Sequence, residues 1–236
     1  MSFASRFEGA LRALSRHEPL HFPPSSIPRA YRRAAVLIPF WAEGDAVRVV
    51  LTRRSSRLSD HGGQVAFPGG RLDAGESWEQ AALREAHEEI GLPPSSVELL
   101  GRLDDAWSGA GHHVVPIVGW VREPPRLVAN PREVAEILVA DVETLLRPES
   151  LSEDAFVHEG HRYVNPVLRW PGGDAYGLTA DLLLEALSFG LGTPAPGGAN
   201  RLDDLERYRR RQRDPEYPHG RHPAAAGLRN PTGGSR

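Results

Sequence analysis

Two kinds of apolar spacing along this chain predict where its helices and strands lie. A spacing of three to four residues near the N-terminus predicts a helix that contains Phe3, Phe7, Leu11 and Leu14. Short apolar or alternating runs further along predict strands with one or both faces buried. These runs are residues 34–41, 47–51, 64–67, 97–103, 114–121, 134–139 and 161–168, the last of which is expected to pair with 155–158.

Helical segments interrupt this series of strands. The pattern predicts helices over residues 78–90, 142–146 and 179–191, of which the last is strongly apolar. A mixed sheet between helices is the arrangement that such an order favours. The sequence therefore predicts an α/β fold.

Composition divides the chain into three parts. Residues 1–28 are expected to form an N-terminal helix and a Pro-rich linker, and residues 29–191 the folded domain. From about residue 192 the apolar periodicity disappears, so 192–236 are predicted to be a flexible tail. The arginine-rich run 207–213 in that tail has acidic neighbours, which favours a solvated segment over a nucleic-acid contact.

Three carboxylates in the middle of the chain fall on one stripe of a predicted helix. At ~100° per residue, Glu85, Glu88 and Glu89 lie within an arc of about 100°. Like charges at this spacing repel and weaken a helix unless a cation neutralises them. Carboxylate oxygens are the ligands that Mg²⁺ and Mn²⁺ prefer, so the stripe predicts a site for such an ion. The alternative is a solvated acidic helix.

Local signals fix the bounds of this helix. Ser77 followed by Gln80 is a capping-box pattern that predicts a start near Trp78, and Gly91 before two prolines predicts the end. An apolar arc beside the carboxylate stripe should pack on the sheet. The arc consists of Ala82, Leu83, Ala86 and Ile90.

The whole segment from Gly70 to Leu92 resembles the Nudix box, Gly-x5-Glu-x7-Arg-Glu-U-x-Glu-Glu-x-Gly-U, where U is a bulky apolar residue. The matching positions are Gly70, Glu76, Arg84, Glu85, Glu88, Glu89, Gly91 and Leu92. The first U position holds Ala86, which is smaller than usual and affects only packing. The resemblance implies an α/β/α sandwich with a mixed sheet, a catalytic loop–helix and metal-dependent hydrolysis of a pyrophosphate bond.

The resemblance also implies roles for individual residues. The glutamates of the stripe would bind Mg²⁺ or Mn²⁺ together with the backbone carbonyl of Gly70, and Glu76 would pair with Arg84 to orient them. The general base is either a box glutamate or one from a loop elsewhere. Glu133 and Glu136 are the candidates outside the box.

A second resemblance precedes the box and concerns the substrate. Residues 51–70 resemble the signature of the coenzyme A pyrophosphatase branch, roughly Leu-Leu-Thr-x-Arg-Ser-x3-Arg-x3-Gly-x3-Phe-Pro-Gly-Gly. The positions in register are Thr52, Arg54, Ser55, Gly63, Phe67, Pro68, Gly69 and Gly70. The second arginine of the signature is replaced by Ser59, with Arg57 two residues earlier. The resemblance implies cleavage of coenzyme A into 3′,5′-adenosine bisphosphate and 4′-phosphopantetheine.

Arginine suits such a substrate because its guanidinium binds phosphate oxygens through two nitrogens and keeps its charge. The residues expected to contact substrate are Thr52, Arg53, Arg54, Ser55, Arg57, Gly63 and Phe67. The arginines have the alternative of being surface residues at a sheet edge. Ser59 leaves open a different nucleoside diphosphate derivative, such as ADP-ribose, and a non-catalytic Nudix-fold binding module is a further alternative, although such modules commonly lose box glutamates that this chain keeps.

Composition narrows the remaining possibilities. A net charge of −3 argues against general nucleic-acid binding, and the absence of cysteine excludes disulfides and thiolate metal sites. No apolar run approaches the ~20 residues of a membrane span, and the N-terminus lacks a secretory apolar core. The expectation is a cytoplasmic protein that acts on a small nucleotide, with its oligomeric state left open.

Overall fold

The computed structural model describes residues 1–19, 21, 31–56, 63–108, 111–158 and 161–192. Arg57, Ser59 and nearly all of the predicted tail lie outside the described residues, as does most of the Pro-rich linker. The predicted boundaries near residues 28 and 191 stay predictions.

The main sheet has eight strands and is mixed, as the order of elements predicts. Along the path β3-β2-β1-β7-β5, the pair β1–β7 is parallel and the other pairs are antiparallel. Strand β4 also pairs with β1, β6 with β7, and β8 with β2. The strands are β1 (Arg32–Glu43), β2 (Ala46–Arg54), β3 (Val65–Ala66), β4 (Gly69–Arg71), β5 (Val97–Arg102), β6 (Ala106–Ser108), β7 (His112–Val121) and β8 (Val134–Asp141).

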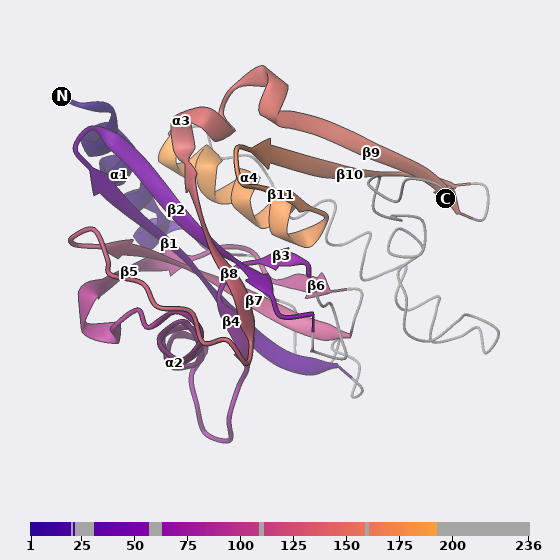
Figure 1. Ribbon diagram of the computed structural model, residues 1–236, viewed down its shortest axis with the longest axis horizontal. Coiled ribbons are helices and arrows are strands. Elements are labelled where there is room, and N and C mark those ends of the chain that lie inside the picture. Colours follow the sequence, from indigo (N-terminus) through magenta and orange to yellow (C-terminus); the bar gives the residue numbers. More distant parts are fainter. Residues whose placement is uncertain (20, 22–30, 57–62, 109–110, 159–160, 193–236) are drawn as a thin grey trace.

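Helices cover both faces of this sheet (Figure 1). Helix α2 (Trp78–Ile90) packs on one face, against a core that includes Ala35 and Leu37 of β1. Helices α1 (Phe3–Leu11) and α4 (Leu178–Gly190) pack on the other face, against a core that includes Ile38 and Phe40. The buried runs of β1 therefore face two separate cores, and the predicted α/β/α arrangement is confirmed.

Close packing joins the two helices of the second face. A Cβ atom placed on Gly190 would lie 2.2 Å from the ring of Phe7, so only glycine allows α1 to approach α4 this closely. The turn that follows α1 is a 3-10 helix, Arg12–Arg16, which packs against β5. Among the described residues, the other short helices are α3 (Val142–Leu145) and the 3-10 turns Pro94–Ser96 and Pro148–Ser150.

A separate antiparallel sheet of three strands lies beside the main one. Its order is β11-β10-β9, formed by β9 (Leu151–His158), β10 (His161–Trp170) and β11 (Gly173–Tyr176). Figure 1 shows the β9–β10 hairpin extending away from the helices and the main sheet. The pairing of β9 with β10 is confirmed, whereas β4, β6 and β11 are too short for an apolar period to predict them. Within the described part of the chain, every helix is too short or too polar to span a membrane.

Candidate active site

Helix α2 has the bounds that its capping residues predict. The Ser77 hydroxyl accepts a hydrogen bond from the Gln80 backbone N–H (3.2 Å), and the Gln80 side-chain oxygen accepts one from the Ser77 N–H (2.9 Å). Gly91 ends the helix in the left-handed region, with φ of 69°. The buried face contains Ala81, Ala82, Ala86 and Ile90, whereas Leu83, which the arc predicted to be buried, is only half-buried.

The two glycines before the helix are required by close contacts. Strand β4 pairs with β1 so that Gly70 lies opposite Ala35, and a Cβ atom on Gly70 would lie 2.3 Å from the Glu85 carboxylate. A Cβ atom on Gly69 would lie 2.4 Å from the carbonyl oxygen of Ala35. The Gly69 N–H donates a hydrogen bond to Glu89 Oε2 (3.2 Å). Backbone and carboxylates therefore meet here without an intervening side chain.

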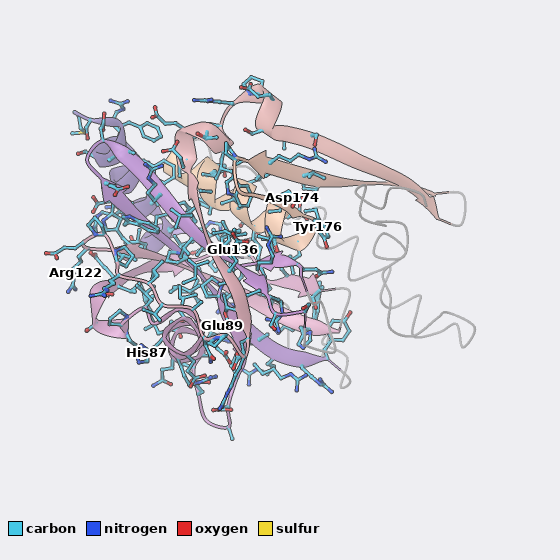
Figure 2. All side chains as sticks on the ribbon, viewed as in Figure 1. His87, Glu89, Arg122, Glu136, Asp174 and Tyr176 are labelled. Atoms are coloured by element: carbon cyan, nitrogen blue, oxygen red, sulfur yellow. The ribbon has the colours of Figure 1, made fainter. Side chains whose placement is uncertain are left out.

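Three carboxylates from two segments gather beside these glycines. Oxygen atoms of Glu85, Glu89 and Glu133 all lie within 4.8 Å of one another. Glu89 is 2% exposed, whereas Glu85 and Glu133 are half-buried. Figure 2 labels Glu89 on α2, next to β8, the strand that follows Glu133. An all-oxygen donor set of this kind fits Mg²⁺ or Mn²⁺.

Backbone hydrogen bonds hold Glu133 against the helix. The Asn130 N–H donates to the carbonyl oxygen of Glu89 (2.8 Å), and the Ser55 N–H donates to the carbonyl oxygen of Glu133 (2.8 Å). The loop before β8 is thereby tied both to the end of α2 and to the end of β2. The Asn-Pro turn at residue 130 was the only local signal in the sequence for this anchor, and it does not reveal the partner.

Burial and crowding disfavour negative charge in this cluster. Burial raises the pKa of Glu89 to about 8, an effect that Arg54 and the Gly69 N–H oppose and that Glu85 and Glu133 reinforce. Burial also raises the pKa of Glu85, against the opposing effect of Arg84. Carboxylates in such an environment gain from a bound cation, because it offsets both the lost solvation and the mutual repulsion.

Arg84 holds the outer side of the cluster. Its Nε and Nη2 donate to the two oxygens of Glu76 (2.9 and 3.0 Å), which lowers the pKa of that carboxyl, and the predicted pair is confirmed. Arg84 Nη1 donates to Glu85 Oε1 (3.0 Å) and to Glu88 Oε2 (3.1 Å). The Glu88 side chain is 51% exposed and lies outside the group of three, so Glu133 occupies the place that the spacing suggested for Glu88.

The two arginines at the end of β2 point to different surroundings. Arg54 Nη1 lies 3.7 Å from Glu89 Oε1 and flanks the cluster. Arg53 Nε donates to Glu136 Oε2 (3.0 Å), and this pair lies away from the cluster, with Glu136 more than half exposed. Successive side chains of a strand point to opposite faces, which separates Arg53 from Arg54, and the pairing of β2 with β8 is irregular between them (Figure 2 labels Glu136). The structure thus brings Glu133 to the site but not Glu136 or Arg53.

Several residues predicted to contact substrate have identifiable structural positions. Thr52 is 1% exposed, and its hydroxyl donates to the Ala66 carbonyl oxygen (3.2 Å), which joins β2 to β3. Ser55 is buried, and Phe67 belongs to the apolar core on the α1/α4 face. Gly63 adopts φ of 79° in the turn whose N–H donates to the Arg54 carbonyl oxygen (2.9 Å). These positions build the sheet and the core around Arg54, and the contacts of these residues with a substrate stay a prediction.

The sequence of this chain matches a known protein family. Residues 30–165 match the model of the NUDIX domain. The chain is 34% identical over 190 residues to Nudix hydrolase 15, mitochondrial, of Arabidopsis thaliana, which covers 77% of this chain and 64% of the relative. It is also 37% identical over 175 residues to Nudix hydrolase 22, chloroplastic, of the same plant, and this match covers 70% of this chain and 58% of the relative. The match thus spans less than two thirds of either relative.

The chain is also similar to a bacterial protein and to a solved structure. The chain is 44% identical over 120 residues to the uncharacterized Nudix hydrolase NudL of Pectobacterium atrosepticum, covering 50% of this chain and 62% of the relative. It resembles the crystal structure of the Nudix hydrolase RenU from M. smegmatis with a TM-score of 0.42 and 30% identity, covering 50% of this chain and 77% of that one.

Proposed function

This chain belongs to the Nudix family, and on that premise we propose that it hydrolyses the pyrophosphate bond of coenzyme A or its derivatives with Mg²⁺ or Mn²⁺. The products would be 3′,5′-adenosine bisphosphate and 4′-phosphopantetheine. The observation that carries the proposal is the group of Glu85, Glu89 and Glu133, whose oxygens lie within 4.8 Å of one another.

The oxygens gathered beside Gly69 and Gly70 support an assignment of the metal ligands. Glu85 and Glu89 would bind it together with the Gly70 carbonyl, whose position the family resemblance supplies. When bound, the ion would neutralise charge on the pyrophosphate and lower the pKa of a coordinated water. Glu85 already has its direction set by Arg84, and Glu89 by the Gly69 N–H, so neither carboxylate needs to be reorganised.

We assign the general base to Glu133 rather than to Glu136. Glu133 reaches the carboxylate group, whereas Glu136 is engaged with Arg53 in an exposed pair. A base must lie within hydrogen-bond reach of the water whose proton it takes, and Glu133 is the loop carboxylate that lies beside Glu85 and Glu89, where such a water would bind the metal. Its half-buried side chain keeps the proton acceptor next to both metal-binding glutamates.

Arg54 supports a substrate with several phosphates. Its guanidinium lies 3.7 Å from Glu89, beside the proposed reaction centre, and such a group binds phosphate oxygens through two nitrogens. Coenzyme A carries a pyrophosphate and a 3′-phosphate, and residues 51–70 match most of the coenzyme A signature. Ser59 at the position of the second signature arginine favours the alternative substrate, a nucleoside diphosphate derivative such as ADP-ribose.

A substrate panel tests the proposal directly. We expect the purified full-length chain with Mg²⁺ or Mn²⁺ to cleave coenzyme A with a higher kcat/KM than ADP-ribose or a dinucleoside polyphosphate. Chromatography should identify 3′,5′-adenosine bisphosphate as the nucleotide product. Faster cleavage of ADP-ribose would replace coenzyme A as the substrate, and tight binding without cleavage under any divalent metal would indicate a binding module.

A further inference from the structure

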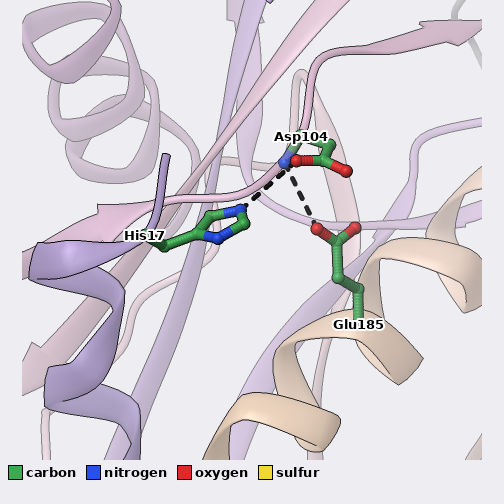
Figure 3. A group of neighbouring side chains, drawn as sticks. All are labelled: His17, Asp104 and Glu185. Carbon is green, nitrogen blue, oxygen red and sulfur yellow. Dashed lines mark hydrogen bonds and ion pairs between the residues drawn. The ribbon is translucent and has the colours of Figure 1, made fainter. Parts of the chain in front are cut away.

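A second group of metal-binding side chains lies on the α1/α4 side of the main sheet. His17 follows the 3-10 helix Arg12–Arg16, Asp104 lies between β5 and β6, and Glu185 lies in the middle of α4 (Figure 3). One donor atom from each of the three lies within 4.8 Å of the other two. Three elements distant in the sequence thus converge on one point.

The imidazole of His17 is held in place by its own packing. Its backbone N–H donates to the Leu14 carbonyl oxygen (3.1 Å), and its ring contacts the ring of Phe189 edge-on, with 4.9 Å between centroids. Phe189 lies one turn after Glu185 on α4, so the ring rests on the helix that carries the carboxylate. His17 Nε2 lies 3.3 Å from Asp104 Oδ1.

The two carboxylates of the group are buried. Asp104 is 8% exposed and Glu185 4% exposed, and the Asp104 N–H donates to Glu185 Oε1 (3.2 Å). Two buried carboxylates this close repel each other when both are ionised, unless a cation lies between them. A dication would neutralise both charges at once.

The neighbouring carboxylate, Asp105, contacts a different set of side chains. Asp105 lies 2.5 Å from Arg102 Nη2 and 2.8 Å from His113 Nε2, so a permanently charged guanidinium faces it. Asp104 lies beside His17, and an imidazole is a metal ligand in its neutral form. Adjacent carboxylates therefore have different surroundings, and only Asp104 belongs to the three-residue group.

We propose that His17, Asp104 and Glu185 bind a divalent transition-metal ion of the Zn²⁺ class. One imidazole nitrogen with two carboxylate oxygens suits Zn²⁺, Mn²⁺ or Fe²⁺, whereas Mg²⁺ prefers oxygen ligands alone. The side chain of His17 is 26% exposed, which gives an ion access from solvent. The bound ion fastens the N-terminal segment to α4 and to the loop between β5 and β6.

The ion would act on stability rather than on the phosphate chemistry. It would bind ligands that come together only in the folded chain, so binding favours the folded state. The group lies among the core elements of the α1/α4 face, whereas Glu85 and Glu89 project from α2 on the other face. The two groups differ in donor chemistry and in position, so they can be tested separately.

The experiment uses the full chain with Glu85→Gln and Glu89→Gln combined, which disables the α2 group. Equilibrium dialysis against Zn²⁺ should retain one ion per chain, and thermal unfolding should occur several degrees higher with Zn²⁺ than with a chelator. His17→Ala, Asp104→Asn and Glu185→Gln should each lose the bound ion and the shift. His87→Ala, which removes an exposed histidine of α2, is the matched control and should keep both.

Two results would overturn the proposal. The first is a folded His17→Ala variant that binds Zn²⁺ with the same stoichiometry and affinity as its parent. The second needs no change in the group: X-ray absorption of the Zn²⁺-loaded parent should show imidazole scattering, and its absence contradicts the assignment. Circular dichroism checks that each variant is folded, so a loss of binding reports on the ligands.

Discussion

Glu76 and Glu89 belong to the same loop–helix segment, yet their surroundings are opposite. Both oxygens of Glu76 accept hydrogen bonds from Arg84, and the pKa of Glu76 is lowered. Glu89 is almost fully buried, its closest described guanidinium nitrogen is 3.7 Å away on Arg54, and its pKa is raised to about 8. The first carboxylate already has its cation within the protein, whereas the second gains from one supplied by solvent.

Within this one segment, some residues therefore orient the carboxylates, whereas others are proposed to bind the metal ion. Arg84 also contacts Glu85 and Glu88, so it fixes the outer row of carboxylates through a single rigid guanidinium. Glu89 and Glu133 lie further inward and are held mainly by backbone groups around them. Substitutions of Arg84 and of Glu89 should therefore affect turnover and metal binding to different extents.

The largest effect is expected from Glu89→Gln. This change removes one ligand charge at the proposed metal site, so metal-dependent turnover should fall roughly 100–1,000-fold. Circular dichroism should show an intact fold. Glu143→Gln, an exposed carboxylate at the start of α3, is the control and should leave turnover unchanged. Wild-type turnover in Glu89→Gln would remove Glu89 from the mechanism.

Arg84→Lys tests whether the hydrogen bonds of the Arg84 guanidinium orient the carboxylates around it. Lysine keeps the positive charge but cannot donate to both oxygens of Glu76 while also contacting Glu85 and Glu88. We expect kcat to fall about 10–100-fold, with a weaker apparent affinity for the metal. Steady-state assays across a Mg²⁺ series separate the two effects. If lysine preserves both parameters, the charge of Arg84 matters and its fork geometry does not.

A smaller effect should distinguish the two arginines of β2. Arg54→Gln removes the guanidinium beside Glu89, so kcat/KM for a phosphate-rich substrate should fall by about 10-fold. Arg53→Gln, at the neighbouring position in the exposed pair with Glu136, is the matched control and should change it little. Equal losses from both variants would contradict the different surroundings of the two arginines.

The smallest effect concerns stability without metal. The pKa of Glu89 rises from its ordinary 4.5 to about 8, so between these values the folded chain keeps a proton that the unfolded chain releases. The Glu89 contribution to folding therefore becomes less favourable as pH rises through this window. In chelator at pH 8, Glu89→Gln should exceed wild type in free energy of unfolding by on the order of 1–3 kcal/mol, since each pKa unit corresponds to about 1.4 kcal/mol.

Urea titrations from pH 5 to pH 8 would measure this difference. The gap between Glu89→Gln and wild type should widen as pH rises, and Glu143→Gln should show no such widening. A gap that stays constant over the range would mean that burial does not hold Glu89 in its protonated form.

Local signals in the sequence predicted the catalytic segment well. The capping box, the αL glycine and the Glu76–Arg84 pair all act within one segment, and the structure has each of them. The buried strands and the mixed sheet also follow from apolar runs. These features depend on neighbours in the chain, which a single sequence records.

Features that depend on distant pairing were not predictable in the same way. The sequence does not show that Glu133 lies closer to Glu85 and Glu89 than Glu88 does, because this depends on hydrogen bonds of Asn130 and Ser55 that tie the loop before β8 to α2 and β2. The opposite directions of Arg53 and Arg54 follow from the alternation of side chains along a strand, but the pairing of Arg53 with Glu136 depends on the register of β2 against β8. Thr52 and Phe67 were expected at the substrate, but the same motif positions also build the core.

The most direct test of the central claim is a Mn²⁺ titration followed by electron paramagnetic resonance, with wild type and Glu89→Gln measured side by side. The buried carboxylates of α2 are proposed to bind a divalent ion, so Glu89→Gln should lose at least one bound Mn²⁺ per chain relative to wild type, and Glu143→Gln should lose none. Identical binding curves for Glu89→Gln and wild type would contradict the claim.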